Sequence, residues 1–255
     1  MIGNLPVTMA SSFSKITVFN VGRANCIKLE DKMGAYFVDA GIENRGPSNV
    51  LAKVFFLTHW HYDHYSLFTK KKNVFGFLVA PKLKKSSSIL ASLYSKKASN
   101  ISSSNRLFIQ PADGIVTLSS AFSCFAFDGK GKKENNHCIV YCLDSARKKY
   151  KISSNSISAC GFSDGFFVFP GDMDARYLTL PAGWHWQFLV SPHHGSISSS
   201  KWGNNRKFFS QACLDPVVIF STSYSNQKIS GPISDYQKCY RLCGFLIPRC
   251  LRMEK

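Results

Sequence analysis

Three histidines and one aspartate occur within six residues, in the segment HWHYDH at 59–64. The segment follows an apolar run and a threonine at the end of an expected buried strand. Imidazole nitrogens and carboxylate oxygens are ligands for a borderline ion such as Zn²⁺. Burying His59, His61, Asp63 and His64 without such an ion would leave several polar groups to satisfy. The spacing H-x-H-x-D-H therefore predicts a metal site.

The same spacing offers enough ligands for two ions. Alternating residues in a turn can point two ways, so His59 and His61 can hold one ion while Asp63 and His64 hold another. Two ions about 3.5–4 Å apart can activate a bridging hydroxide and bind the oxygens of a displacement reaction.

A pair of ions needs a shared carboxylate and further distal ligands. We expect Asp172, in the segment FPGDMD, to be the bridge. Either His193 or His194, in the segment SPHHGS, would complete the second ligand shell.

These polar residues recur where apolar, strand-like segments end. Asp39 lies near the end of AYFVDAG (35–41), and the histidine segment follows VLAKVFFLT. Asp172 and His193 follow two later apolar runs. Strand ends on one edge of a sheet can converge in space, although they are far apart in sequence. A site held on such a rigid scaffold is therefore expected.

The order of these motifs resembles the metallo-β-lactamase fold family. FVDAG, H-x-H-x-D-H, PGD and SPHHGS follow one another as in that family, over residues 15 to 225. The opening VFNVGRANCIKL and the later PHHGS resemble the competence-type (ComEC-like) branch, which occurs in DNA-uptake proteins. The resemblance implies an α+β fold, a four-layer αββα sandwich with the metal site at one edge of the sheets, as a single domain over 1–255.

The resemblance also implies roles by position. It assigns His59 and His61 to the first ion, Asp63 and His64 to the second, Asp172 to the bridge, and one of His193 and His194 to the last ligand. It implies that Asp39 is an outer carboxylate that orients the histidine segment.

A third ligand of the first ion is usually a downstream histidine in this family. The segment KENNHCIVY offers His137. The competence-type branch commonly has asparagine in this neighbourhood, so Asn135 and Asn136 are candidates for a polar, non-ligating role. The cofactor implied is Zn²⁺, as one or two ions, with Mn²⁺ as the alternative.

The charge of the chain indicates a phosphate-rich partner. Lys and Arg total 32 against 15 acidic residues, a net charge of +17. Such a surface attracts polyanions, and nucleic acid is the first candidate. The Lys/Ser-rich segment 66–106 is expected to form an exposed basic helix with flexible flanks. The lysines expected to contact phosphates are Lys70, Lys71, Lys72, Lys84 and Lys85.

These features together favour a metal-dependent hydrolase that uses a metal-bound hydroxide, most specifically a phosphodiesterase or nuclease. Asp63 would orient the hydroxide or take its proton. The non-ligating member of His193 and His194 would stabilise the charged transition state. One alternative is a hydrolase of a small ester, lactone or amide, with a closed apolar pocket and little dependence on salt. Another is a basic nucleic-acid-binding module with a degenerate metal site.

The remaining composition indicates the compartment. The nine cysteines show no C-x-x-C pair, so we expect reduced thiols rather than a disulfide framework or a zinc ribbon. No run approaches the ~18 apolar residues of a membrane helix, and the N-terminus lacks a signal-peptide pattern. The expectation is a cytoplasmic protein with no membrane partner.

Overall fold

The computed structural model describes residues 9, 13–19, 21, 24–41, 46–69, 72–82, 105–127, 137–144, 165–174, 176–195, 206–220 and 249–252. The strands are β1 (Lys15–Val18), β2 (Cys26–Asp31), β3 (Gly34–Ala40), β4 (Leu51–Phe56), β5 (Val74–Pro81), β6 (Arg106–Ile109), β7 (Ile115–Ser119), β8 (Phe122–Ala126), β9 (Ile139–Asp144), β10 (Phe166–Phe169), β11 (Trp186–Val190), β12 (Ala212–Phe220) and β13 (Arg249–Arg252). The helical segments are α1 (Tyr62–Tyr65), α3 (Arg206–Phe209) and the 3-10 turns η1 (Ser66–Thr69), η2 (Pro111–Asp113) and η4 (Pro192–Gly195). No helix in the described ranges is both long enough and apolar enough to cross a membrane.

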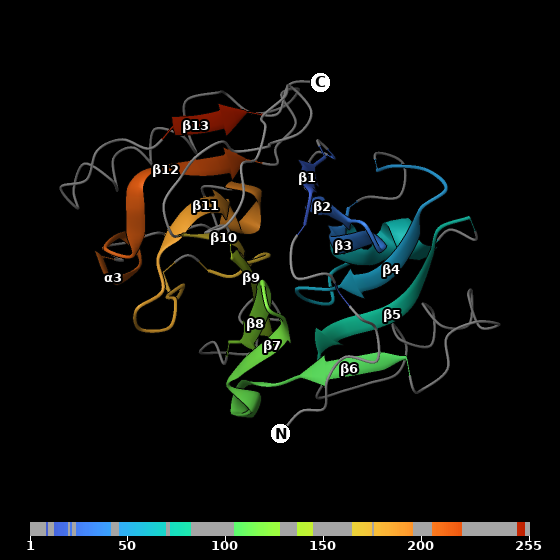
Figure 1. Ribbon diagram of the computed structural model, residues 1–255, viewed down its shortest axis with the longest axis horizontal. Helices are drawn as coiled ribbons and strands as arrows, with labels where there is room; N and C mark the ends of the chain where they lie inside the picture. Colours follow the sequence, from blue (N-terminus) through green and yellow to red (C-terminus); the bar gives the residue numbers. More distant parts are fainter. Residues whose placement is uncertain are drawn as a thin grey trace.

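The first sheet has six strands in sequence order, β1 to β6 (Figure 1). Strands β1, β2 and β3 pair antiparallel and form a meander. The turn between β2 and β3 is closed by Asp31, whose Oδ1 accepts hydrogen bonds from the backbone N–H groups of Met33 and Gly34. Strands β3, β4, β5 and β6 then run parallel, so their carboxyl ends share one edge of the sheet.

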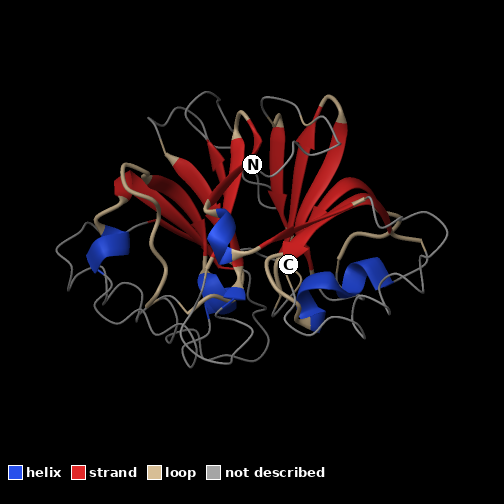
Figure 2. Ribbon diagram, turned by 90° about the horizontal axis from the view of Figure 1, so that it is seen from below, coloured by secondary structure: helices blue, strands red, loops and turns tan. Residues whose placement is uncertain are grey.

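The second sheet has seven strands in sequence order, β7 to β13, and repeats this plan. Strands β7, β8, β9 and β10 pair antiparallel, and β10, β11, β12 and β13 run parallel. Figure 2 shows the two sheets as two separate groups of strands with short helices beside them. The carboxyl ends of β10 and β11 therefore also share an edge.

Three hydrophobic clusters divide the molecule into layers. Alternate side chains of both sheets, such as Phe56 and Phe167, pack together between the sheets. The outer face of the first sheet is covered by side chains of α1 and η1, including Phe68. The outer face of the second sheet is covered by α3, including Phe208. This arrangement confirms the predicted α+β sandwich, but each of the two described α-helices has only four residues.

Hydrogen bonds join the two sheets close to their shared edge. The buried hydroxyl of Tyr141, on β9, donates to the carbonyls of Leu57 (3.1 Å) and Val79 (3.3 Å) in the first sheet. The backbone N–H of Ile139 donates to the carbonyl of Thr58 (2.8 Å). These bonds fix β9 against the ends of β4 and β5, so the two halves of the edge have a defined relative position.

The prediction for segment 66–106 was wrong for residues 74–81, which were expected to be a flexible flank of the basic helix. Residues Val74–Pro81 instead form the largely buried strand β5. The Lys- and Ser-rich flanks dominate the composition of the segment and mask the apolar run VFGFLVAP, which has the length of a buried strand. The expected basic helix around Ile89 to Tyr94 lies outside the described residues.

Candidate metal centre

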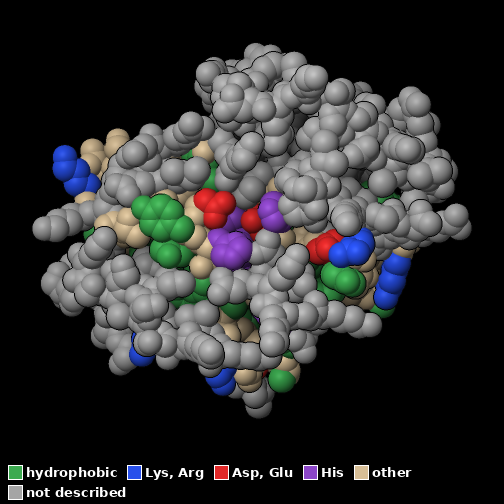
Figure 3. Space-filling model, turned by 180° about the vertical axis from the view of Figure 1, so that it is seen from behind, with side chains coloured by type: hydrophobic (Ala, Val, Ile, Leu, Met, Phe, Trp, Pro, Cys, Tyr) green, Lys and Arg blue, Asp and Glu red, His purple; other side chains and the backbone are tan. Residues whose placement is uncertain are grey.

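The predicted polar residues meet at the edge where the parallel strands end. Asp39 is the penultimate residue of β3, and His59 follows β4. Asp172 follows β10, and His193 lies in η4 after β11. Figure 3 shows one face of the molecule with histidine and acidic side chains gathered in its middle. The convergence arises because β3 and β4 are parallel, as are β10 and β11.

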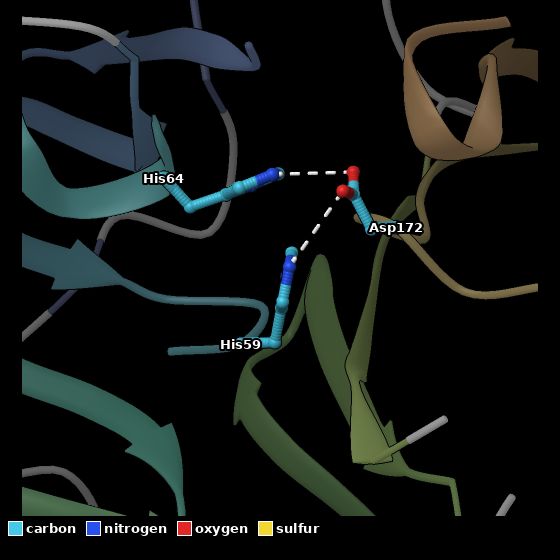
Figure 4. A group of neighbouring side chains, drawn as sticks. All are labelled: His59, His64 and Asp172. Atoms are coloured by element: carbon cyan, nitrogen blue, oxygen red, sulfur yellow. Dashed lines mark ion pairs between the residues drawn. The ribbon is translucent and has the colours of Figure 1, made fainter. Parts of the chain in front are cut away.

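Three buried side chains form a compact group with ligand chemistry. One ligand atom from each of His59, His64 and Asp172 lies within 4.8 Å of the others. Nε2 of His64 is 3.1 Å from Oδ1 of Asp172, and Nε2 of His59 is 3.8 Å from Oδ2 (Figure 4). The imidazoles come from the first sheet and the carboxylate from the second. Two imidazole nitrogens and one carboxylate oxygen are a donor set that fits a borderline divalent ion such as Zn²⁺.

Three further predicted ligands surround this group. Nδ1 of His61 lies 3.0 Å from Nε2 of His59. Oδ2 of Asp63 is 4.0 Å from Nε2 of His64, and Nε2 of His193 is 3.8 Å from Oδ2 of Asp172. The compact group thus takes one histidine from each predicted pair together with the predicted bridge. His61, Asp63 and His193 are only partly buried and form its outer side.

Each of the other predicted site residues lies either outside the compact group or outside the described residues. His137 lies directly before Cys138 and β9, and it is not a member of the compact group among the described residues. The side chain of His194 and the whole of Asn135 lie outside the described residues. Their roles stay predictions.

Asp39 and Thr58 fix the orientation of both buried histidines. Oδ2 of Asp39 accepts a hydrogen bond from Nδ1 of His64 (2.7 Å), which turns Nε2 toward Asp172. The hydroxyl of Thr58 lies 2.9 Å from both oxygens of Asp39 and donates to that carboxylate. The same hydroxyl oxygen then accepts from Nδ1 of His59 (3.1 Å), which leaves the Nε2 lone pair of His59 on the ligand side.

The backbone at this edge is strained in two places. Asp39 has φ +52° and His193 has φ +50°, in the left-handed region that residues other than glycine seldom adopt. Such conformations persist where the surrounding contacts impose them, and they concentrate at functional sites.

Two residues without ligand chemistry were missed from the sequence. Thr58 forms the hydrogen bonds described above, and Gly171 packs against it from the second sheet. A Cβ atom on Gly171 would lie 2.4 Å from Oγ1 of Thr58, so only glycine fits there. The carbonyl of Gly171 also accepts the backbone N–H of His193 (3.0 Å). The Pro-Gly pair in FPGD signals a turn, but the sequence does not indicate what packs against that turn.

Lys72 is the one predicted phosphate-binding lysine within the described residues, and it lies far from the histidines. Asn73 accepts a hydrogen bond from the N–H of Val50, and Val74 pairs with Leu51 at the start of β4. His59 follows the other end of β4. Six strand residues separate these ends, a distance of about 20 Å. Lys70, Lys71, Lys84 and Lys85 lie outside the described residues.

The buried carboxylates control the protonation of His64. Complete burial by itself lowers the pKa of His64, but Asp172 and Asp39 outweigh burial and raise the pKa well above its ordinary value. Protonation then stabilises the folded, metal-free protein fully below the unfolded pKa of about 6.5. That stabilisation is lost as the pH rises through the folded pKa.

We therefore expect metal-free wild-type protein to lose more stability between neutral and alkaline pH than a His64→Gln variant. Urea unfolding of both chelator-treated proteins, from about pH 6 to about pH 9, measures the difference in slope. Parallel pH profiles would show that His64 is not held protonated by its two carboxylates. Bound metal and the proton compete for Nε2, so metal affinity should fall as the pH decreases.

No protein-family model matches the chain, and no curated protein matches it. Among solved structures, the chain is similar to a metallo-β-lactamase fold protein, YhfI from Bacillus subtilis, with 11% identity, a TM-score of 0.45, and coverage of 94% of this chain and 96% of that one. It is also similar to a protein of the metallo-β-lactamase superfamily from Thermotoga maritima, with 14% identity, a TM-score of 0.42, and coverage of 88% and 84%. The metallo-β-lactamase SMB-1 gives 12% identity, a TM-score of 0.40, and coverage of 71% and 78%.

Proposed function

We propose that this protein is a metal-dependent hydrolase that cleaves phosphodiester bonds in nucleic acid. The observation that carries the proposal is the convergence of His59, His64 and Asp172, with ligand atoms within 4.8 Å of one another. The order of the sequence motifs supports it, because that order resembles the metallo-β-lactamase fold family and its competence-type branch.

The buried side chains of the centre are suited to hold a metal ion. When bound, a divalent ion supplies an activated water and positive charge for the transition state. His59, His64 and Asp172 hold it, and Asp39 and Thr58 keep the two imidazoles aimed.

The partly exposed residues of the centre are available to substrate. The side chain of Asp63 is 35% exposed and lies within 4.0 Å of Nε2 of His64, so its carboxylate is suited to accept a proton from the attacking water. His193, beside Asp172, is suited to donate a hydrogen bond to a phosphate oxygen of the substrate.

The charge of the chain supports phosphodiesters over neutral substrates. At +17, the protein attracts polyanions at long range, whereas a small ester gains nothing from that charge. Lys72 lies about 20 Å from the centre, or about six phosphates along one strand of a duplex. Lys72 would therefore bind a phosphate distant from the one that is cleaved.

Cleavage assays test the reaction itself. Purified protein is analysed for bound metal and then incubated with single- and double-stranded DNA and RNA in the presence of Zn²⁺ or Mn²⁺. We expect cleavage of at least one of the four polymers. If the protein hydrolysed a neutral lactone or thioester and left all four polymers intact, the nuclease proposal would be wrong. The protein would then be a hydrolase of small esters.

The salt dependence of nucleic-acid binding tests whether the predicted lysines contact phosphates. Changing Lys70, Lys71, Lys72, Lys84 and Lys85 to Gln removes up to five phosphate contacts, each worth about −0.9 in the slope of log affinity against log salt on duplex DNA. We expect the slope to flatten by a few units relative to wild type. The control changes five other lysines to Gln, so the net charge falls equally: Lys15, Lys28, Lys32, Lys53 and Lys207. Equal slopes for the two variants would show that the first five lysines form only a solvated face.

A further inference from the structure

We propose that Tyr62 is a stacking platform for a nucleobase next to the scissile phosphate. The inference rests on the proposed nuclease function. It concerns the base of the substrate, whereas the metal centre acts on the phosphate. It follows from the position of one exposed aromatic ring and from the contacts that hold that ring.

Tyr62 lies between two residues of the metal segment. It begins helix α1, with His61 before it and Asp63 after it. Its side chain is 55% exposed, whereas the next two residues after Asp63 are buried. The helical turn thus directs His64 inward to the centre and leaves the ring of Tyr62 at the rim.

The ring of Tyr62 is held by a column of aromatic side chains. Tyr62 and Tyr65 meet edge to face, with ring centroids 5.7 Å apart and planes at 82°. Tyr65 in turn contacts Trp60, at 6.5 Å and 60°. The indole N–H of Trp60 donates to the carbonyl of Pro81 (3.0 Å), so the column is fixed to the end of β5. A ring held in this way loses little conformational entropy when a ligand stacks on it.

The position of Tyr62 differs from that of the other exposed large apolar residues. Within the described ranges these are Met33, Leu51 and Ile115, and none of them is aromatic. Met33 lies in the β2–β3 turn, Leu51 begins β4 at the end away from the histidines, and Ile115 begins β7. Scattered apolar side chains of that kind are normal on a surface.

The chemistry of a phenol ring defines the ligand class. Every nucleobase presents a π-face, so stacking on an aromatic side chain tolerates any sequence and is worth about 1–3 kcal/mol per base. A phosphodiester without a base gains nothing from this ring. The ligand is therefore a nucleotide polymer of any sequence, with an accessible, unpaired base beside the cut.

The test compares two oligonucleotides of equal charge. One is a fluorescein-labelled thymidine 12-mer and the other is an abasic 12-mer of the same length, both with phosphorothioate linkages to slow cleavage. We expect Tyr62→Ala to weaken binding of the thymidine strand by about 5- to 140-fold in fluorescence anisotropy, while binding of the abasic strand stays unchanged. Tyr62→Trp should bind both strands as wild type does.

Two controls separate stacking from damage to the site. The metal content of Tyr62→Ala should equal that of wild type, because the ring is not a ligand. Leu51→Ala removes an exposed apolar side chain from the opposite end of β4 and should change neither affinity.

The outcomes distinguish this inference from the proposed function. Equal affinity of wild type and Tyr62→Ala for the thymidine strand, or equal losses on both strands, would overturn the stacking site. Absence of cleavage of unmodified DNA and RNA by wild type would instead overturn the nuclease activity, and base-dependent loss of binding in Tyr62→Ala would still support the stacking site.

Discussion

Replacing Asp172 with Asn should leave the protein folded but without bound metal and without hydrolytic activity. The carboxylate is 3% exposed, and its two oxygens face Nε2 of His64 at 3.1 Å and Nε2 of His59 at 3.8 Å. Asparagine keeps the shape of the side chain but lacks the negative charge that offsets a bound cation. Its amide group also places a donor where the carboxylate had an acceptor. We expect bound metal to fall to background and cleavage to fall below detection.

Asp174→Asn is the matched control for this prediction. Asp174 carries the same chemistry two residues further along and forms an exposed ion pair with Arg176 (2.6 Å). Removing its charge should affect neither metal content nor activity, because exposed pairs contribute little. Metal analysis, cleavage rates and circular dichroism of the two variants provide the comparison. Wild-type metal content in Asp172→Asn would show that this carboxylate is not a ligand.

Much of the fold could be predicted because each strand has its own apolar pattern. The segments that became β3, β4, β9, β10 and β11 are short apolar runs bounded by turn residues, and the structure has strands in all of them. Strand β5 was missed because its apolar run lies between Lys- and Ser-rich flanks. The composition averaged over 66–106 is polar and hid this short apolar run. Its side chains, such as Phe75 and Phe77, are buried in the structure.

The chemistry of the centre was easier to predict than its geometry. Ligand types are a property of single side chains, so the spacing of HWHYDH offered His59 and His64 among four candidate ligands. Asp172 was expected as the bridge from its place after an apolar run. Which of their atoms converge depends on the register of two sheets and on the bonds of Tyr141 that join them. These contacts link residues more than 60 positions apart, and no local pattern encodes them.

Proximity in the sequence was misleading for Lys72. Lys72 is eight residues from His64, yet the chain crosses the outer face of the sheet between them and returns to the opposite edge. A parallel pair of strands requires such a crossover, because the second strand must begin at the end where the first one began. Residues that follow a crossover therefore lie one strand length from those that precede it.

Gly171→Ala should reduce both stability and metal binding, because Gly171 sets the spacing between the two halves of the centre. Its φ of +61° costs an alanine about 1–2 kcal/mol. The new Cβ would also lie 2.4 Å from Oγ1 and 2.6 Å from Cβ of Thr58. Thr58 cannot turn away without losing its hydrogen bonds to Asp39. The loop of Gly171 must therefore move outward and carry Asp172 away from the two imidazoles.

Gly183→Ala separates this contact from the cost of the backbone conformation. Gly183 has φ +79°, and a Cβ atom there would meet nothing within 4 Å. Both variants place an alanine in the left-handed backbone conformation, but only in Gly171→Ala does the new Cβ overlap another side chain. That overlap should lower the free energy of unfolding by a further amount of about 1–3 kcal/mol. Urea unfolding and metal titration of the two variants measure the two effects. Gly183→Ala should bind metal as wild type does, since its loop carries no ligand. If both variants lost equal stability and kept equal metal affinity, the contact between Gly171 and Thr58 would not control the centre. If Gly171→Ala alone lost metal, the distance between His64 and Asp172 would be set by the close approach of these two loops.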